Sequence, residues 1–265
     1  EVVDVSEHLH LHTLAHPGST AQLLELVSRL HSSLLDRSRP LWEQHIIDGL
    51  PGDRFAFYSK LHHALLDGKR AMAIAQLSTS SNPRRRNLPP GWAVDQDALQ
   101  AIIARRVAKA QPDTDVQSLD SWFETVRTLG ADWVRSRVRR PGSGVIAPYT
   151  APESILNRPL SARRSIAMCS LPLRTIEAVG SAAGATVNEV LLGCCAGALH
   201  RYLQQRRALP KTPLIAGVAA AIARTDNAVS GNVVGQILVS LATDRRDSWA
   251  RLEAVMESSS AAKSH

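Results

Sequence analysis

The sequence predicts an α/β fold in which strands and helices alternate along the chain. Short apolar segments flanked by turn residues indicate strands, and longer segments with apolar residues every three or four positions indicate amphipathic helices. The composition agrees, because 44% of the 265 residues are hydrophobic and 21% are charged. Such a chain can form a packed interior as one large domain or two modest ones, and its composition disfavours global disorder.

The first half of the chain is predicted to hold a β-hairpin among helices. Apolar residues recur at helical spacing after the turn Pro17–Thr20, which predicts a helix from about Thr20 to Leu35. Two strand-like segments flank Gly49–Asp53, a sequence typical of a hairpin turn. The expected elements are strands at Trp42–Asp48 and Arg54–Leu61, helices at Gly68–Leu77, Asp95–Lys109 and Val116–Arg137, and a linker at Ser78–Gly91.

The second half begins with a loop-rich crossover, Pro141–Pro159, and then alternates again. Gly184 follows an apolar helical pattern directly, as a residue that closes a helix does. The expected elements are strands at Ser165–Leu171, Leu214–Ala223 and Val233–Leu241, and helices at Leu173–Ala183, Thr186–Gln205 and Ser248–Ala262. On the long helix Gly193 and Gly197 lie four residues apart, which predicts the close approach of another element.

The net charge of +7 does not by itself indicate a nucleic-acid partner. Its arginines are scattered, and the densest groups, Arg84–Arg86 and Arg135–Arg140, lie in or near predicted linkers. These groups lack the interleaved aromatic side chains on which single-stranded bases stack. We therefore expect no nucleic-acid partner.

Membrane-spanning and disulfide-bonded classes are also disfavoured. The longest uncharged apolar runs, Val190–Leu199 and Leu214–Ala223, are about half as long as the roughly 20 residues a spanning helix needs. The three cysteines, Cys169, Cys194 and Cys195, are too few for a disulfide framework. We expect them to be small buried residues in a reducing compartment. No spacing in the chain resembles a zinc site.

The segment that carries chemistry is His62–His63, followed by Asp67 and Gly68. Adjacent residues at the end of a strand point to opposite sides, so one imidazole can face a cleft while the other braces the turn. A neutral histidine there suits a general base that removes a proton from a hydroxyl group. The alternatives are a packing pair or a metal site, and a metal site would need ligands that the nearby spacing does not supply.

These residues form the pattern His-His-x-x-x-Asp-Gly, which resembles the motif of the coenzyme A-dependent acyltransferase superfamily. That superfamily includes chloramphenicol acetyltransferase and the condensation domains of peptide synthetases. The flanking sequence is similar to the bacterial wax ester synthase/diacylglycerol acyltransferase family in three further elements, in order and spacing: Pro40–Leu41–Trp42, Asn188–Glu189 and Gly231–Asn232.

The resemblance implies a chloramphenicol-acetyltransferase-like α/β fold of two lobes, with mixed sheets and flanking helices. Residues 1–80 would form part of the N-terminal lobe with the motif, residues 81–160 a helical crossover, and residues 161–265 part of the C-terminal lobe. Family members are longer at both ends, and this chain starts without Met or a signal peptide. We therefore expect a fragment that lacks an N-terminal strand region and most of the closing sheet and helices.

The resemblance also implies a reaction, the transfer of a long acyl chain from acyl-CoA to diacylglycerol or a fatty alcohol. His63 would be the general base, with His62, Asp67 and Gly68 shaping the motif around it. Substrate contacts would come from Pro40, Leu41 and Trp42, which either line an acyl channel or pack a strand, and from Asn188 and Glu189. Asn188 would either donate to the oxyanion or pantetheine or support the helix cap. Acyl-CoA is a co-substrate, and no cofactor or metal is expected.

The chain departs from the family pattern at two places. Glu189 stands where the family has Asp, and Thr186-x-x-Glu189 is also a helix-capping box. Lys69–Arg70 follows the motif where small or apolar residues are common, which would alter the mouth of the site. The first alternative is an acyltransferase of the same superfamily with another acceptor, such as an amine, a glycoside or a carrier-bound acyl chain. The second is a catalytically silent lipid-binding or scaffold homologue, which Lys69–Arg70 and the missing ends favour. The third, a basic nucleic-acid binder, is the least favoured.

The family's substrates imply a cytoplasmic protein with peripheral contact to the inner membrane or to lipid droplets. The aromatic stripe from Trp122 to Trp133 either sits at such an interface or belongs to the core.

Overall fold

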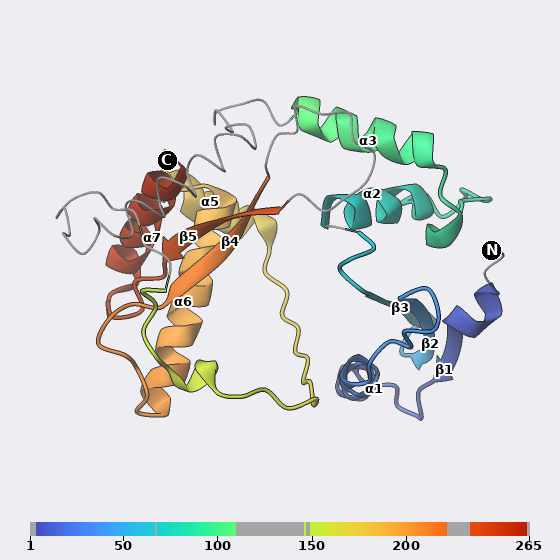
Figure 1. The fold of residues 1–265 in the computed structure, drawn as a ribbon, viewed down its shortest axis with the longest axis horizontal. Coiled ribbons are helices and arrows are strands. Elements are labelled where there is room, and N and C mark those ends of the chain that lie inside the picture. Colours follow the sequence, from blue (N-terminus) through green and yellow to red (C-terminus); the bar gives the residue numbers. More distant parts are fainter. Residues whose placement is uncertain (1–3, 67, 110–145, 147–148, 222–233, 264–265) are drawn as a thin grey trace. The chain divides into compact units, whose positions relative to one another are not determined.

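The computed structural model describes residues 4–66, 68–109, 146, 149–221 and 234–263, and the chain divides into two compact units (Figure 1). The first unit comprises the described residues of Glu1–Lys109 and Pro159–Cys169, and the second those of Ala110–Arg158 and Ser170–His265. Both units mix helices with a sheet, so the predicted α/β class is confirmed. The division into three segments stays a prediction.

The first unit is built on a three-stranded sheet in the order β1-β2-β3. The predicted hairpin is confirmed as β2 (Trp42–Leu50) and β3 (Arg54–Leu61), which pair antiparallel. Gly49, Gly52 and Asp53 have positive φ in the turn, which explains the two glycines there. The sequence analysis did not predict β1 (Leu9–Thr13), which follows the short 3₁₀ helix η1 (Val5–His8) and pairs parallel with β2.

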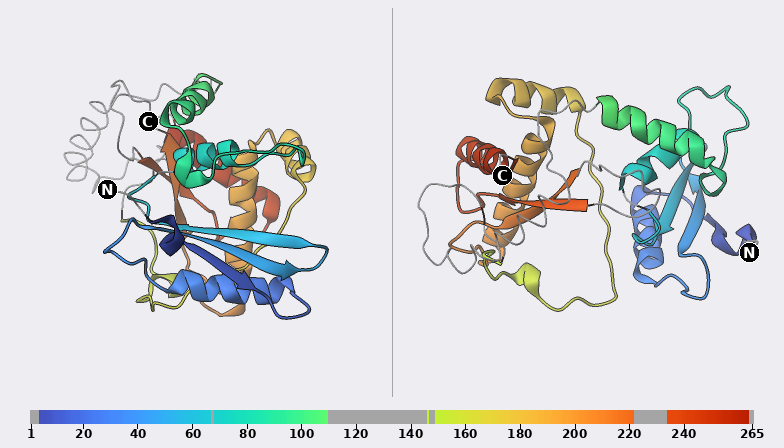
Figure 2. Two further views of the ribbon diagram at one scale, coloured as in Figure 1. Left: turned by 90° about the vertical axis from the view of Figure 1, so that its right-hand side faces the viewer. Right: turned by 45° about the horizontal axis from the view of Figure 1, so that its top comes forward.

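Helix α1 (Thr20–Ser32) connects β1 to β2 and lies against one face of the sheet (Figures 1 and 2). Ser19 caps its start, where the hydroxyl of Ser19 accepts the Gln22 N–H and the Gln22 side chain accepts the Ser19 N–H. His31 Nδ1 is 2.8 Å from the Tyr58 hydroxyl, which joins the helix to β3. The helix ends three residues before the predicted Leu35, because Ser33 already has extended geometry.

The strand predicted at Ser165–Leu171 is wrong, because this segment forms no ladder with any described strand. Instead it lies along α1. The backbone N–H groups of Arg164 and Ile166 donate to the hydroxyls of Ser32 and Ser28 at 2.8 and 3.0 Å. Ser28 and Ser32 are one helical turn apart on α1, so their hydroxyls can accept hydrogen bonds from every second backbone N–H of the segment. In a sheet, a neighbouring strand would accept these hydrogen bonds.

Two further helices complete the first unit. Helices α2 (Gly68–Ser78) and α3 (Gln96–Lys109) occupy the predicted ranges closely, and the short η2 (Gly91–Ala93) follows the expected linker. Their core consists of Ala73, Val94 and Leu99, with partly buried Ile74, Leu77, Ile102 and Ile103 around it.

The second unit packs helices on a two-stranded antiparallel sheet. It contains η3 (Ile155–Asn157), α5 (Leu173–Ala183), α6 (Val187–Gln205), β4 (Ile215–Ala221), β5 (Val234–Ser240) and α7 (Ser248–Lys263). All but η3 follow the predicted order and ranges. Its core consists of Ala196, Leu203, Leu214 and Leu241. Gly184 ends α5 in the left-handed conformation, with φ of 67°, as the sequence predicted.

The predicted role of the two glycines on α6 is confirmed. A Cβ atom on Gly193 would lie 3.1 Å from Leu252 Cδ1, and one on Gly197 would lie 3.2 Å from Arg251 Nη1. Both neighbours belong to α7, so the glycines allow α6 and α7 to pack closely.

The prediction that the cysteines are buried is wrong. Cys169, Cys194 and Cys195 are exposed free thiols. On α6 the buried side of the helix carries Val190, Ala196 and Leu203 instead, so the apolar run is exposed on one side.

Several predictions fall outside the described residues, namely the helix at Val116–Arg137 with its aromatic stripe, Asp67, and the Gly231–Asn232 element. Among the described residues, no single helix is both long enough and apolar enough to cross a bilayer. Helices α5 and α6 reach that length and composition only when joined, and they meet at 99°.

Candidate functional site

The two motif histidines lie in the turn between β3 and α2. Leu61 is the last residue of β3, and Gly68 is the first residue of α2. Both His62 and His63 are exposed to solvent. Strand pairing places this turn at the end of the hairpin where β2 begins, since Leu61 pairs with Trp42.

His62 holds the turn together. Its N–H donates to the Leu41 carbonyl at 2.9 Å, and its own carbonyl accepts the Leu65 N–H at 3.0 Å. The ring nitrogen Nδ1 accepts the Ala64 N–H at 3.1 Å, so the neutral ring carries its proton on Nε2. One histidine of the pair thus braces the turn.

His63 is the exposed imidazole that the turn presents after His62. The orienting residue expected beside it, Asp67, lies outside the described residues. Gly68 is exposed, and a Cβ atom placed on it would meet nothing within 4 Å. Crowding in the first unit therefore does not explain the glycine of the motif.

Pro40, Leu41 and Trp42 lie directly beside the histidine turn, because the Leu41 carbonyl receives the His62 N–H. The Trp42 ring stacks between His8 and Trp92, with ring centroids 4.2 and 5.7 Å away. His8 Nδ1 is also 2.7 Å from the Trp42 carbonyl. Trp42 therefore packs the start of β2, and the acyl channel stays a prediction.

Asn188 and Glu189 belong to the second unit, at the start of α6. Asn188 is exposed, whereas Glu189 is 6% exposed. The capping box predicted from the sequence is confirmed. Glu189 Oε2 accepts the Thr186 N–H and hydroxyl, each at 2.9 Å, and the Thr186 hydroxyl accepts the Glu189 N–H at 3.3 Å.

The other carboxylate oxygen of Glu189 is 3.1 Å from Lys263 Nζ, at the end of α7. Burial acts to raise the pKa of Glu189, but the hydrogen bonds from Thr186 and Lys263 outweigh it and lower the pKa below the usual glutamate value. Glu189 is thus an ionised structural group. Its role as a substrate contact stays a prediction.

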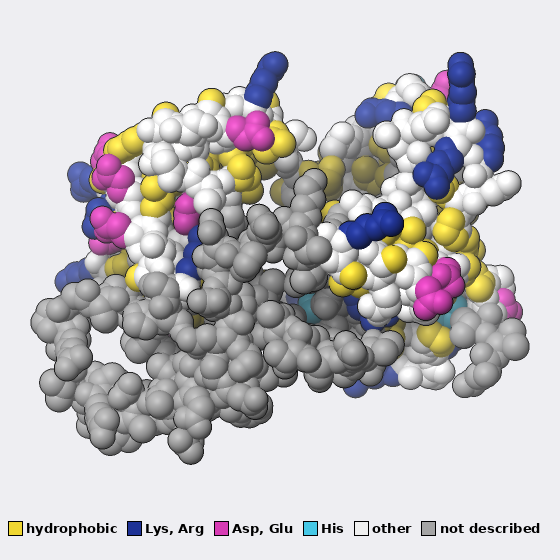
Figure 3. All heavy atoms as spheres, turned by 90° about the horizontal axis from the view of Figure 1, so that it is seen from above, with side chains coloured by type: hydrophobic (Ala, Val, Ile, Leu, Met, Phe, Trp, Pro, Cys, Tyr) yellow, Lys and Arg dark blue, Asp and Glu magenta, His cyan; other side chains and the backbone are white. Residues whose placement is uncertain are grey.

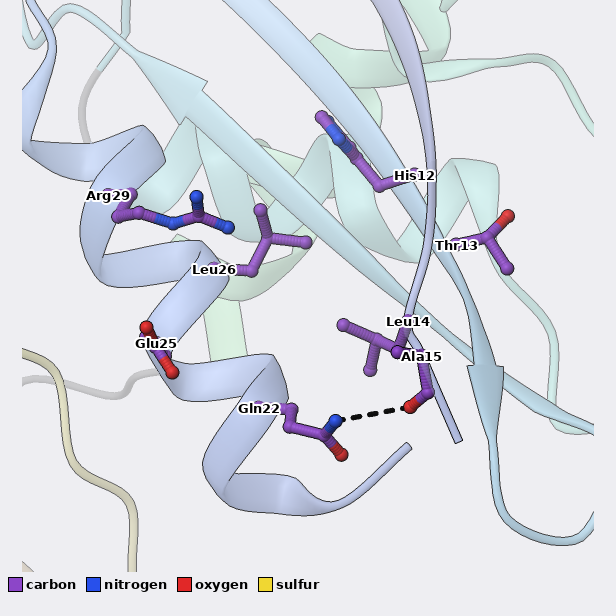
Figure 4. A pocket seen from close by; sticks show the side chains of 8 residues that line it. All are labelled: His12, Thr13, Leu14, Ala15, Gln22, Glu25, Leu26 and Arg29. Atoms are coloured by element: carbon purple, nitrogen blue, oxygen red, sulfur yellow. Dashed lines mark hydrogen bonds between the residues drawn. The ribbon is translucent and has the colours of Figure 1, made fainter. Parts of the chain in front are cut away.

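Two open cavities lie apart from the described motif residues. In the first unit a cavity of about 380 Å³ separates the end of β1 from α1, and Gln22 Nε2 donates to the Ala15 carbonyl across it (Figure 4). In the second unit a cavity of about 500 Å³ lies at α6 and α7, with Arg201, Arg246 and Arg251 in its lining. Neither cavity is lined by a described motif residue.

Basic side chains do not gather in one place on the face shown in Figure 3, where Lys and Arg stand among apolar and acidic groups. The expected absence of a nucleic-acid partner stays a prediction.

Comparison with known proteins gives consistent matches. The model of the wax ester synthase/diacylglycerol acyltransferase catalytic domain matches residues 1–191. A putative diacylglycerol O-acyltransferase of Mycobacterium tuberculosis is 39% identical over 254 residues, which cover 96% of this chain and 55% of that protein. The chain therefore spans about half the length of this relative.

Solved structures agree on the fold. The wax ester synthase/diacylglycerol acyltransferase of Marinobacter aquaeolei is 34% identical, with a TM-score of 0.68, over 99% of this chain and 54% of that one. A condensation domain of the calcium-dependent antibiotic synthetase shares 18% identity, with a TM-score of 0.50, over 96% of this chain and 55% of that one. This second likeness concerns the fold alone.

Proposed function

Since the chain belongs to the wax ester synthase/diacylglycerol acyltransferase family, we propose that the protein is an acyl-CoA-dependent O-acyltransferase. The observation that carries the proposal is the exposed His62–His63 turn between β3 and α2, inside the matched residues. The acceptor in this proposal is diacylglycerol or a fatty alcohol, and the product is a triacylglycerol or a wax ester.

In the proposed mechanism His63 is the general base. Its imidazole takes the proton of the acceptor hydroxyl as the oxygen attacks the thioester carbonyl. When the tetrahedral intermediate collapses, the carbon–sulfur bond breaks and the proton passes from His63 to the CoA thiolate. General-base catalysis of this kind contributes about 10²–10⁴-fold to the rate. The exposure of His63 at the end of a strand supports this role, because a substrate can reach it.

His62 supports the mechanism through the backbone. Its ring and main chain make the hydrogen bonds that close the turn, so the position of His63 depends on it. Asp67 and Gly68 complete the motif in this proposal, with Asp67 as an orienting residue that does not exchange protons with the substrate.

The substrate contacts are proposed at two places. Leu41 is hydrogen-bonded to the histidine turn, so the apolar Pro40–Leu41–Trp42 segment can guide an acyl chain towards it. Asn188 is exposed in the first turn of α6, where its amide and the helix N-terminus can donate to an oxyanion or to pantetheine. Glu189 would act by fixing the helix start rather than by touching the substrate.

Acyl-CoA is the co-substrate in this proposal, and the reaction needs no further cofactor, because the thioester already supplies the activated acyl group. The apolar products and acceptors favour a cytoplasmic protein that contacts the inner membrane or lipid droplets peripherally.

The test is the release of CoA thiol from palmitoyl-CoA, with hexadecanol and a diacylglycerol supplied separately. We expect release that depends on the acceptor and that His63→Ala abolishes. His16→Ala is the matched control, because His16 is an exposed histidine of the same unit outside the motif.

The proposed role of His63 would be refuted if no CoA thiol were released with either acceptor. It would also be refuted if His63→Ala released as much CoA thiol as the parent. Release with an amine or a glycoside instead would identify a different acceptor. Acyl-CoA binding without release would identify a silent lipid-binding homologue.

A further inference from the structure

One face of the sheet in the first unit gathers imidazole and carboxylate side chains that the proposed reaction does not use. Because β1 and β2 pair in parallel register, His10 lies opposite His45, and Glu43 precedes His45 by two residues on the same face. One ligand atom from each of these three residues lies within 4.8 Å of the other two. The sequence analysis missed this cluster, because His10 lies more than thirty residues before Glu43 and His45 and β1 was not predicted.

We propose that His10, Glu43 and His45 form a binding site for a divalent first-row transition-metal ion such as Zn²⁺. Two imidazole nitrogens and one carboxylate oxygen are the donors that such ions prefer, whereas Ca²⁺ and Mg²⁺ prefer oxygen alone. The remaining coordination positions would be filled by water. The site lies entirely in the first unit, and none of its three ligands belongs to the His62–His63 turn.

The state of His45 is the observation that points to a ligand. His45 is 3% exposed, and its Nε2 atom is buried without a hydrogen-bond partner among the described residues. This atom lies 3.4 Å from Glu43 Oε2, without hydrogen-bond geometry. A buried polar atom without a hydrogen bond destabilises a fold. A metal ion between the two groups would satisfy both.

The other ring nitrogen of His45 already has a polar contact, as the second nitrogen of a metal-binding histidine usually does. His45 Nδ1 is 3.1 Å from His12 Nε2, on the same face of the neighbouring strand. Such an outer contact fixes the orientation of the ring and directs the opposite nitrogen to the metal.

The side chains around the cluster affect how tightly it can bind a metal ion and how firmly His45 is held. Lys60 Nζ lies 3.5 Å from Glu43 Oε2, so a metal ion must share this carboxylate with an ammonium group. The Tyr58 ring stacks on His45 with centroids 5.4 Å apart, and its hydroxyl contacts His31 of α1. Lys60 thus makes the affinity moderate, while the aromatic packing holds His45 in place.

A metal ion at this site would cross-link β1 to β2. Among the described strands, β1 lies at the edge of the sheet and pairs with β2 alone. Coordination by His10 from β1 and by Glu43 and His45 from β2 would add a cross-link between the two strands. The metal would thus stabilise the first unit without entering the acyl-transfer reaction.

The test is a titration of the untagged full chain with Co²⁺, followed by its visible absorption and by displacement with Zn²⁺. We expect one Co²⁺ per chain, bound through nitrogen and oxygen. His10→Ala and Glu43→Gln each remove a ligand and should weaken binding by at least about 100-fold, whereas His12→Ala should weaken it by about 10–100-fold. His16→Ala is the matched control and should bind as the parent does.

Two further measurements keep the result interpretable. The double variant Cys194→Ser/Cys195→Ser should keep the absorption spectrum, since thiolate coordination would give intense bands that it would remove. Added Zn²⁺ should raise the thermal midpoint of the parent but not of His10→Ala, whose circular dichroism should match the parent. If His10→Ala does not fold, His10→Gln takes its place.

Unchanged Co²⁺ affinity in His10→Ala or His10→Gln would overturn the proposal. Loss of the spectrum in the double cysteine variant would overturn it equally, and would assign the metal to the exposed thiols instead.

Discussion

The histidine turn after β3 and the start of α6 both belong to the predicted site, but they treat their ionisable side chains in opposite ways. The turn leaves His62 and His63 exposed and is closed by main-chain hydrogen bonds to Leu41 and Leu65. The helix start buries Glu189 and surrounds its carboxylate with Thr186 and Lys263. An exposed imidazole is available to a substrate, whereas a fully paired carboxylate is not.

Under the proposed function, this difference separates His63, which would serve the reaction, from Glu189, which serves the fold. Both segments resemble family motifs, so the motif alone does not distinguish the two roles. The distinction comes from burial, since His62 and His63 are exposed whereas Glu189 is buried. Substitutions at the two places should therefore affect different observables.

The largest expected effect is on turnover at the histidine turn. His63→Ala should lower kcat by about 10²–10⁴-fold, because it removes the proposed general base. Its free energy of unfolding should stay within about 0.5 kcal/mol of the parent, because the side chain is exposed. Steady-state kinetics and urea denaturation on the same preparation check both statements. If His63→Ala lost much stability but kept its turnover, the histidine turn would not differ from the start of α6 in the way described.

The next largest effect is on stability at the helix start. Glu189→Ala should lower the free energy of unfolding by about 2 kcal/mol, because it removes the buried carboxylate that accepts the Thr186 N–H and hydroxyl and pairs with Lys263. Urea denaturation measures this loss. Asn188→Ala is the matched control on the adjacent, exposed position, and it should be close to neutral for stability. Equal losses at both positions would show that the capping box contributes little.

The fold was predictable wherever a local pattern decides the outcome. Capping residues, turn glycines and helical periodicity located the hairpin, α2, α3 and the elements of the second unit. One failure has a non-local cause, and another was a local pattern that was overlooked. The segment Ser165–Leu171 has strand-like composition, but Ser28 and Ser32 of α1 bind its backbone. In β1, histidine and leucine alternate with a period of two, a signal that a closer count would have found.

The candidate site was likewise predictable where its residues are contiguous in the sequence, and not where distant segments meet. The motif located the histidine turn from the sequence, because its residues are contiguous. The cluster of His10, Glu43 and His45 depends on parallel pairing between distant segments, and no local spacing encodes that register. The side of α6 that becomes buried was also undetermined, which is why the adjacent cysteines were placed wrongly.

The charge of Glu189 can be separated from its capping role. Glu189→Gln keeps an acceptor for the Thr186 N–H but removes the ion pair with Lys263, so it should cost about 1 kcal/mol at neutral pH. The folded pKa of Glu189 is lowered, so the parent's advantage is complete above the usual value of 4.5 and is lost as the pH falls through the folded pKa. Urea denaturation at pH 7 and at pH 3 measures the change. A difference that does not depend on pH would contradict the ionised carboxylate.

The smallest effect tests whether the two histidines of the turn differ from each other. His62→Ala removes the acceptor of the Ala64 N–H, but this amide is exposed and water can replace the ring. The cost in stability should therefore be about 0.5 kcal/mol, far below that of Glu189→Ala.

Turnover of His62→Ala should fall less than that of His63→Ala, because the proposed base remains while its position becomes less fixed. Kinetics of the two single variants and the double variant decide this point. If His62 acts through the position of His63, the double variant should be no slower than His63→Ala, whereas multiplied losses would indicate that His62 contributes independently.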